Sequence, residues 1–236
     1  MNITMTPDAS ESDFIDGEIE KKNYRRRWVT NVKKIPSHPF NHGIHMDTHH
    51  LISKEAVNLS KLGKLLVKKG FDINDLNNLV GFPATLPGAC QLKTQLHRGD
   101  HIFKPPGEEP YHDEVSKSLV YLEVKIERCY GKTKKRETSH DIHQLLNPVA
   151  KNILKKITRF QLPLTELYLN FKHGNNIGCG NCFEVKDARF NATACEHGRA
   201  HYKQLYVSGV DYRYQSSNAY KKIIMYSESW TPKVTK

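Results

Sequence analysis

The sequence predicts an α+β fold, with two short strands and several separate helices rather than a regular alternation of the two. The strands are expected over residues 45–52 and 72–84. Apolar residues at helical spacing predict helices over residues 60–70, 111–128 and 141–159. Only 38% of the 236 residues are hydrophobic, which is low for a globular chain and predicts a small core under an extensive polar surface.

Turn and cap residues set the expected boundaries of these elements. Pro83 and Pro87 close the second strand, because proline cannot donate a hydrogen bond to a neighbouring strand. Ser60 is expected to cap the first helix and Gly70 to end it. Pro148 is expected to interrupt the last helix or to restart it.

Composition divides the chain into three regions. Residues 1–40 form an N-terminal extension that is first acidic and then basic, and residues 41–128 hold the main histidine motifs. Residues 129–236 form a basic C-terminal region with a cluster of cysteines and histidines. Six acidic residues precede Lys21, so the formal charge rises from +11 for the whole chain to +17 for residues 21–236. A strongly basic body favours a polyanionic partner such as nucleic acid.

A small C-terminal subdomain stabilised by zinc is expected from the cysteine pattern. A Cys-x-x-Cys pair is followed by a further cysteine and two histidines, and such side chains are the usual ligands of a tetrahedral structural zinc. Free thiols and a redox pair are the alternatives. The expected ligands are Cys179, Cys182, Cys195, His197 and His201.

Two groups of histidines carry the predicted chemistry. His97 and His101 are four residues apart, so on a helix both rings would project from one face and share one cation. Adjacent residues on a strand point to opposite faces, so His49 can bind the metal while His50 faces the substrate as general base. The chain holds 13 histidines, and isolated pairs of this kind are often surface or packing residues. The order of the motifs within one segment favours a site.

The segment of residues 102–109, which follows His101, bears on how His97 and His101 are presented. Pro105 and Pro106 exclude a helix there, because each removes a backbone donor and fixes φ. The helix with the closing ligand is therefore expected after Pro110. His97 and His101 would then lie before that helix, on a loop or a single turn.

An ordered set of motifs surrounds the histidines. Its members are Thr48-His49-His50-Leu51-Ile52, Lys54-Glu55-Ala56-Val57, Asn77-Asn78-Leu79-Val80, Leu86-Pro87, His97-Arg98-Gly99-Asp100-His101, Pro110-Tyr111-His112 and Val115. The set resembles the AHH family of the HNH/endonuclease VII superfamily, nuclease toxins with a ββα-metal (His-Me finger) fold and an Ala-His-His signature. Thr48 stands where the family has alanine, and residues 102–109 interrupt a run that is tighter in the family. Either His101 or His112 could therefore complete the metal site.

The resemblance and the chemistry of phosphodiester hydrolysis together imply a role for each residue. His50 would be the general base, Asn77 or Asn78 would hold it or its loop in place, and Arg98 would lie near the phosphate. Neutral imidazoles suit zinc or nickel, whereas magnesium prefers more oxygen ligands. The expected ligands of one divalent metal are His49, His97, and His101 or His112. The side chains expected to bind nucleic acid are Lys93, Lys132, Lys134, Lys135 and Arg136.

The resemblance further implies a metal-dependent endonuclease that cuts DNA with little sequence specificity and acts as an antibacterial toxin. A cognate immunity protein and a secretion-system carrier would be its partners. The first twenty residues lack the layout of a secretory signal, and no run is long enough to span a bilayer. The protein would then be made in a bacterial cytoplasm and delivered, without a cleavable leader, into the cytoplasm of a target cell. The alternatives are an RNase and a zinc-stabilised nucleic-acid-binding protein without catalysis.

Overall fold

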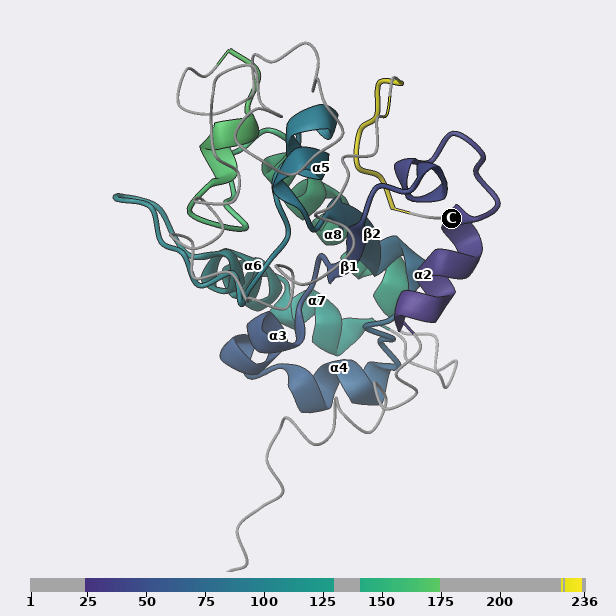
Figure 1. Cartoon of the computed structure of the whole chain (residues 1–236). Coiled ribbons are helices and arrows are strands. Elements are labelled where there is room, and N and C mark those ends of the chain that lie inside the picture. The colour runs from purple at the N-terminus through teal and green to yellow at the C-terminus, as the bar shows by residue number, and fades with distance from the viewer. Residues whose placement is uncertain (1–23, 130–140, 175–225, 227, 235–236) are drawn as a thin grey trace, which may run out of the picture.

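The computed structural model describes residues 24–129, 141–174, 226 and 228–234, and it confirms an α+β fold (Figure 1). Two strands lie near the centre, with the helices arranged around them. None of the helices described is long and apolar enough to cross a membrane. In chain order the elements are α2 (Tyr24–Val32), η1 (Pro39–His42), β1 (Met46–His50), α3 (Lys54–Ser60), α4 (Gly63–Lys69), η2 (Leu76–Asn78), β2 (Leu79–Pro83), α5 (Leu86–Leu92), α6 (Tyr111–Tyr121), α7 (Glu123–Arg128), α8 (Ile142–Thr158) and η3 (Tyr168–Phe171).

The two strands form an antiparallel pair that carries the double histidine, with α3 and α4 in the connection between them. This pair of strands is called the hairpin below. In its register His49 pairs with Val80 and His50 with Leu79. The second strand is shorter than expected, because the residues before Leu79 form the 3-10 turn η2, in which the Asp75 side chain accepts a hydrogen bond from the backbone of Asn77. The hairpin therefore presents its two histidines at the end where the second strand begins.

The helix expected over residues 60–70 is α4, and α3 before it is a further helix that was not expected from the sequence. Ser60 does not cap α4, whose N-cap is Leu62. Ser53 caps α3 by accepting a hydrogen bond from the backbone of Ala56, and Ser60 is the last residue of that helix. The next residue, Lys61, has a φ of 61°, a left-handed conformation that ends the helix. Gly70 ends α4 as expected, with a φ of 83°.

The later helices differ from the expectation in opposite ways. The expected helix over residues 111–128 is divided at Leu122, where the backbone leaves helical geometry between α6 and α7. By contrast, α8 continues through Pro148 without a break. Its first turn is closed by a capping box between Asp141 and Gln144, and a stripe of six buried apolar residues follows its length. Packing along that stripe stabilises the helix by more than the missing backbone donor of Pro148 destabilises it.

The larger of two hydrophobic clusters joins residues on both sides of the boundary expected at residue 128. Val80 of β2 and Val115 of α6 belong to the same buried cluster as Leu146 and Ile153 of α8. The helix that follows the expected nuclease region is therefore part of the body that supports the histidines.

Trp28 of α2 is the centre of a second cluster. It is fully buried with Met46 of β1 and Leu79 of β2, so it is a core residue rather than a platform for a nucleic-acid base. Its indole ring lies directly against Gly81, where an added Cβ would come within 2.1 Å of Trp28 Cζ2. Only glycine allows the helix to approach the hairpin this closely.

We expect Gly81→Ala to lower the free energy of unfolding by about 1–3 kcal/mol, the usual effect of overpacking a well-filled core. Urea denaturation of the parent and the variant measures this difference. In the double variant Trp28→Leu/Gly81→Ala the added methyl group meets a smaller side chain, so the two effects should be less than additive. A Gly81→Ala protein as stable as the parent would contradict the close contact.

Candidate metal centre

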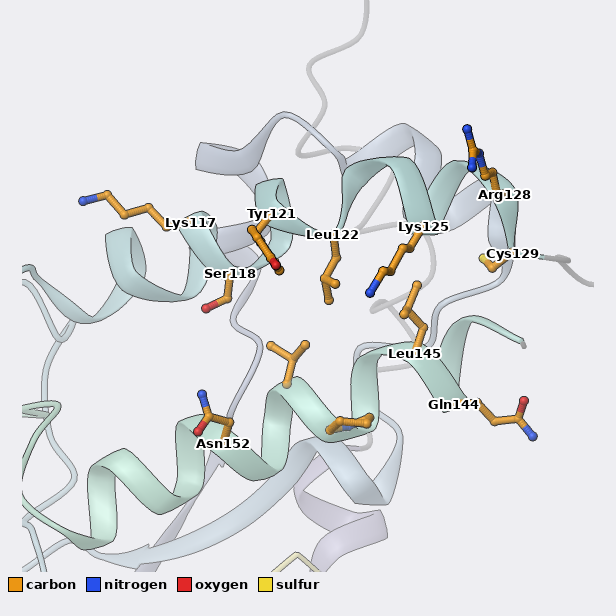
Figure 2. A pocket seen from close by; sticks show the side chains of 12 residues that line it. Lys117, Ser118, Tyr121, Leu122, Lys125, Arg128, Cys129, Gln144, Leu145 and Asn152 are labelled. Atoms are coloured by element: carbon orange, nitrogen blue, oxygen red, sulfur yellow. The ribbon is translucent and has the colours of Figure 1, made fainter. Parts of the chain in front are cut away.

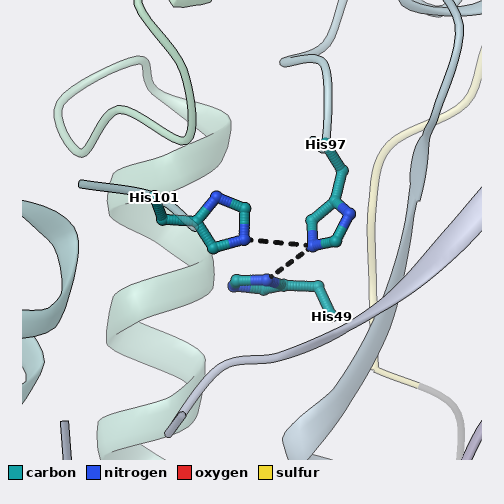
Figure 3. A group of neighbouring side chains, drawn as sticks. All are labelled: His49, His97 and His101. Atoms are coloured by element: carbon teal, nitrogen blue, oxygen red, sulfur yellow. Dashed lines mark hydrogen bonds between the residues drawn. The ribbon is translucent and has the colours of Figure 1, made fainter. Parts of the chain in front are cut away.

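Three histidines from two parts of the chain bring one ring nitrogen each to a common point (Figure 3). His49 lies on β1, and His97 and His101 lie on the loop between α5 and α6. His97 Nε2 is 3.0 Å from His49 Nδ1 and 3.2 Å from His101 Nε2. All three nitrogens lie within 4.8 Å of one another. Three imidazole nitrogens at such distances suit a single small cation.

The outer hydrogen bonds of two rings determine which nitrogen carries a lone pair. His101 Nδ1 is 2.9 Å from the carbonyl of Leu164, which can only accept, so Nδ1 carries the proton and Nε2 the lone pair. The Tyr111 hydroxyl donates to the carbonyl of Leu51 at 2.7 Å, and its oxygen therefore accepts from His49 Nε2 at 2.8 Å. His49 Nδ1 is then the bare nitrogen. Two lone pairs converge on His97 Nε2, which can donate at most one proton, so the donor set fits a metal.

Burial keeps these imidazoles neutral. It lowers the pKa of His101 to about 4 and, together with the neighbouring histidines, holds the pKa values of His49 and His97 well below their ordinary value. Burial also raises the pKa of Tyr111, so its hydroxyl keeps the proton that it donates to the backbone. At neutral pH, protons therefore compete weakly with a metal for these nitrogens.

His97 and His101 meet across a turn of the loop rather than on one face of a helix. Gly99 and His101 both have left-handed backbones, with φ values of 66° and 56°. A positive φ is uncommon for a residue with a side chain, and such strain is typical of functional sites. The backbone N–H of His97 donates to the carbonyl of Pro83 at 2.9 Å, which ties the loop to the end of β2. The expected loop before α6 is confirmed.

Gln95 joins this loop to the segment that follows α8. It is fully buried, and its side-chain amide donates to the carbonyls of Ile157 and Leu162 at 2.7 and 2.9 Å. Its side-chain oxygen accepts from the backbone of Leu164 at 2.8 Å. Leu164 is the residue whose carbonyl orients His101. No pattern of residues in the sequence indicates this role, because none relates residue 95 to residue 164.

His112 lies outside the group of three nitrogens. Its Nδ1 is 2.8 Å from Ser53 Oγ and its Nε2 is 2.8 Å from the carbonyl of Asp100. Both ring nitrogens are therefore occupied by other partners, and the ring braces the loop next to His101. The structure brings His101, rather than His112, to His49 and His97.

His50 faces the other side of the strand, towards Asn74. Its Nε2 is 2.8 Å from Asn74 Oδ1, so Nε2–H donates and Nδ1 is the basic nitrogen. The ring of Tyr24 lies with its centroid 4.5 Å from that of His50. Burial lowers the pKa of His50, while the hydrogen bond to Asn74 and the charge of Asp72 act in the opposite direction. The sequence interpretation did not include Asn74, although its place in an Asp-x-Asn turn is a weak signal for such a role.

Asn78 holds the backbone after His50 rather than its ring. Its side-chain amide donates to the carbonyls of Ile52 and Ile73 at 3.0 and 2.8 Å, and its oxygen accepts from the backbone of Ile52 at 2.7 Å. The neighbouring Asn77 bonds instead to Asp75. Of the two candidate asparagines, only Asn78 therefore supports the turn that follows the double histidine.

The two cations expected near the phosphate, Arg98 and Lys93, are both at least partly buried. Arg98 is 7% exposed, and its Nε donates to the carbonyl of Ala84 at 2.6 Å, which is a contact inside the fold. Lys93 is half-buried and ends α5 with a φ of 49°. The other expected nucleic-acid and structural-zinc residues lie outside the described residues: Lys132, Lys134, Lys135, Arg136, Cys179, Cys182, Cys195, His197 and His201.

A groove of about 850 Å³ lies between α6–α7 and α8, away from these histidines (Figure 2). Apolar side chains such as Leu122 and Leu145 line it together with the cations Lys117, Lys125 and Arg128. No histidine contributes to its lining. The chemistry described above therefore belongs to the hairpin and its loop rather than to this groove.

One comparison with known proteins gives a match. Residues 30–157 match a family model described as a nuclease family of the HNH/ENDO VII superfamily with conserved AHH. The matched span includes the hairpin, the loop with His97 and His101, and nearly all of α8. Neither the curated proteins nor the solved structures include a match.

We expect His101→Ala to weaken zinc and nickel binding by more than the roughly 10- to 100-fold that loss of an outer-shell partner costs. His112→Ala is the comparison variant and should weaken binding by no more than that amount, because its ring nitrogens bond to Ser53 and Asp100 and support the loop from outside the ligand group. Isothermal titration calorimetry measures both. If His112→Ala loses the metal and His101→Ala keeps it, the assignment is reversed.

We also expect the metal-free protein to lose stability as the pH falls from about 6.5 to about 4. The pKa of His101 is about 4 in the folded protein, against 6.5 for an ordinary histidine. Between these values the unfolded chain binds more protons, so stability is fully present above the higher value and is lost below it. Urea denaturation with EDTA across this range measures the slope, which His101→Asn should reduce. A stability independent of pH there would show that these rings are not buried as neutral groups.

Proposed function

Because the chain belongs to the AHH family of HNH/endonuclease VII nucleases, we propose that it is a metal-dependent endonuclease that hydrolyses DNA with little sequence specificity. The observation that carries the proposal is that two adjacent histidines of β1 contact different groups. His49 turns towards His97 and His101, and the adjacent His50 turns towards Asn74. One strand thus carries the proposed metal ligand and the proposed base as adjacent residues that face in opposite directions.

His50 is the proposed general base. Its lowered pKa keeps the imidazole neutral near pH 7, and with Nε2–H bound to Asn74 its Nδ1 is free of a proton and can take one from water. Asn74 keeps the ring in this tautomer and orientation. Asn78 supports the same arrangement through the backbone that follows.

His49, His97 and His101 are the proposed ligands of the catalytic metal. A divalent cation bound there supplies charge stabilisation to the phosphate and to the departing 3′ oxygen. A set of three neutral imidazoles without a carboxylate favours zinc or nickel over magnesium. Tyr111 and the carbonyl of Leu164 hold two of the rings with their lone pairs inward.

The basic character of the chain supports a nucleic acid as the substrate, and the family resemblance favours DNA. A formal charge of +11 favours binding to phosphates regardless of sequence. We further propose a role as an antibacterial toxin, carried by a secretion apparatus into a target cell and neutralised by an immunity protein. That role is supported by the resemblance to toxins of this family.

We expect His50→Ala to lower the rate of plasmid cleavage by about 10²–10⁴-fold, the usual effect of losing a general base. Binding of DNA and of zinc should stay near the parent values, because His50 does not belong to the ligand group. His42→Ala removes a histidine on the exposed turn η1 and is the matched control. A His50→Ala protein that cuts as fast as the parent would remove His50 from the mechanism.

The same assay tests the metal and the substrate. EDTA should abolish cleavage, and zinc or nickel should restore it. Plasmid DNA and single-stranded RNA are compared under identical conditions, and preferential cleavage of RNA would establish an RNase instead. Binding without cleavage in the presence of every divalent metal would establish a nucleic-acid-binding protein.

A further inference from the structure

We propose that α2 is a positioning element of the nuclease site, and that its Arg27 fixes the orientation of His50 through Asn74. The family match begins at residue 30, so most of α2, including Arg27, lies before the matched region. The inference rests on the proposed role of His50 as general base. Arg27 would then support the general base from outside the region that matches the family.

The helix is held firmly against the hairpin that carries the histidines. Trp28 is fully buried and fills the space above Gly81 of β2. Arg25 Nη1 donates to the carbonyl of Met46 at 3.1 Å and pairs with Asp47 Oδ1 at 3.3 Å, both on β1. These contacts place this turn of the helix, which includes Arg27, in a defined position relative to His50.

From that position Arg27 bonds to the turn that orients the base. Arg27 Nη1 donates to Asp72 Oδ2 at 2.7 Å and to the carbonyl of Asn74 at 3.1 Å. The backbone of Asn74 donates to the other oxygen of Asp72 at 2.9 Å. The Asn74 side chain, only 3% exposed, accepts from His50 Nε2 at 2.8 Å. A continuous series of hydrogen bonds thus leads from the guanidinium of Arg27 to the imidazole of His50.

The energetics favour a positioning role over a stabilising one. The side chains of Arg27 and Asp72 are 46% and 38% exposed, and an ion pair of this exposure contributes little to stability. By contrast, a displacement of about 1 Å at a reacting group can lower a rate about 100-fold. Tyr24, also on α2, limits the rotation of the His50 ring from another side. Loss of Arg27 should therefore affect the rate more than the stability.

The test compares two substitutions that remove the same charge from the same helix. Arg26 and Arg27 are adjacent and both exposed, so Arg26→Met and Arg27→Met weaken the general attraction of DNA to a similar extent. We expect Arg27→Met to lower kcat by about 10- to 100-fold, with KM, zinc affinity and Tm close to those of Arg26→Met. Arg27→Lys should recover part of kcat, because an ammonium group can donate to the same two oxygens.

A double-mutant cycle then tests the route through Asn74. Arg27→Met and Asn74→Ala should be less than additive in kcat, because both act on the same ring. Equal kcat for Arg26→Met and Arg27→Met would overturn the inference, as would full additivity in the cycle. If Arg27→Met loses Tm and zinc affinity together with kcat, the role is structural and the inference also fails. Full activity of His50→Ala would instead overturn the proposed function, so the two failures are distinguishable.

Discussion

The hydrogen bond between His49 Nε2 and the Tyr111 hydroxyl is the interaction on which the rest of the site depends. His49 is 3% exposed on a strand in the middle of the protein, and a buried imidazole needs a partner for each nitrogen. Tyr111, the first residue of α6, accepts a hydrogen bond from one nitrogen and donates its own hydroxyl hydrogen bond to the carbonyl of Leu51. The other nitrogen of His49, Nδ1, faces the loop that carries His97 and His101. Helix α6 therefore has to begin beside β1, and the loop before it has to return to the strand.

The remaining contacts keep that loop in place. His97 bonds through its backbone to the end of β2, and His101 bonds through its ring to the segment after α8. Gln95 connects the same two parts of the chain inside the core. The position of α8 is therefore transmitted to the ligand group, although α8 contributes none of the three histidines. This explains why one core includes both the hairpin and a helix that lies far along the chain.

The base side of the strand is organised by a different set of elements. Asn74 orients the ring of His50, and Asn78 holds the backbone that follows it. Both asparagines lie in the short stretch between α4 and β2, and Arg27 of α2 reaches that stretch from outside. The two adjacent histidines thus depend on separate supports. Substitutions in α2 should therefore affect the orientation of His50, whereas substitutions around α8 should affect the three histidines of the ligand group.

Several features of the site follow from sequence alone because they depend on local geometry. The opposite directions of His49 and His50 follow from the alternation of side chains along a strand. The start of α6 after Pro110 follows from the prolines before it, which cannot continue a helix. The order of the histidine motifs was sufficient to predict the family that the comparison identified.

Other features were decided only by the tertiary structure. His101 rather than His112 joins the ligand group because a left-handed turn and the carbonyl of Leu164 direct its ring inward. Asn74 rather than Asn78 meets His50, and Arg98 is bound to Ala84 inside the fold instead of facing the solvent. Each of these outcomes depends on a hydrogen bond between residues distant in sequence. Such a bond forms only where the packing of whole helices brings its two partners within about 3 Å, and no local pattern of residues contains that information.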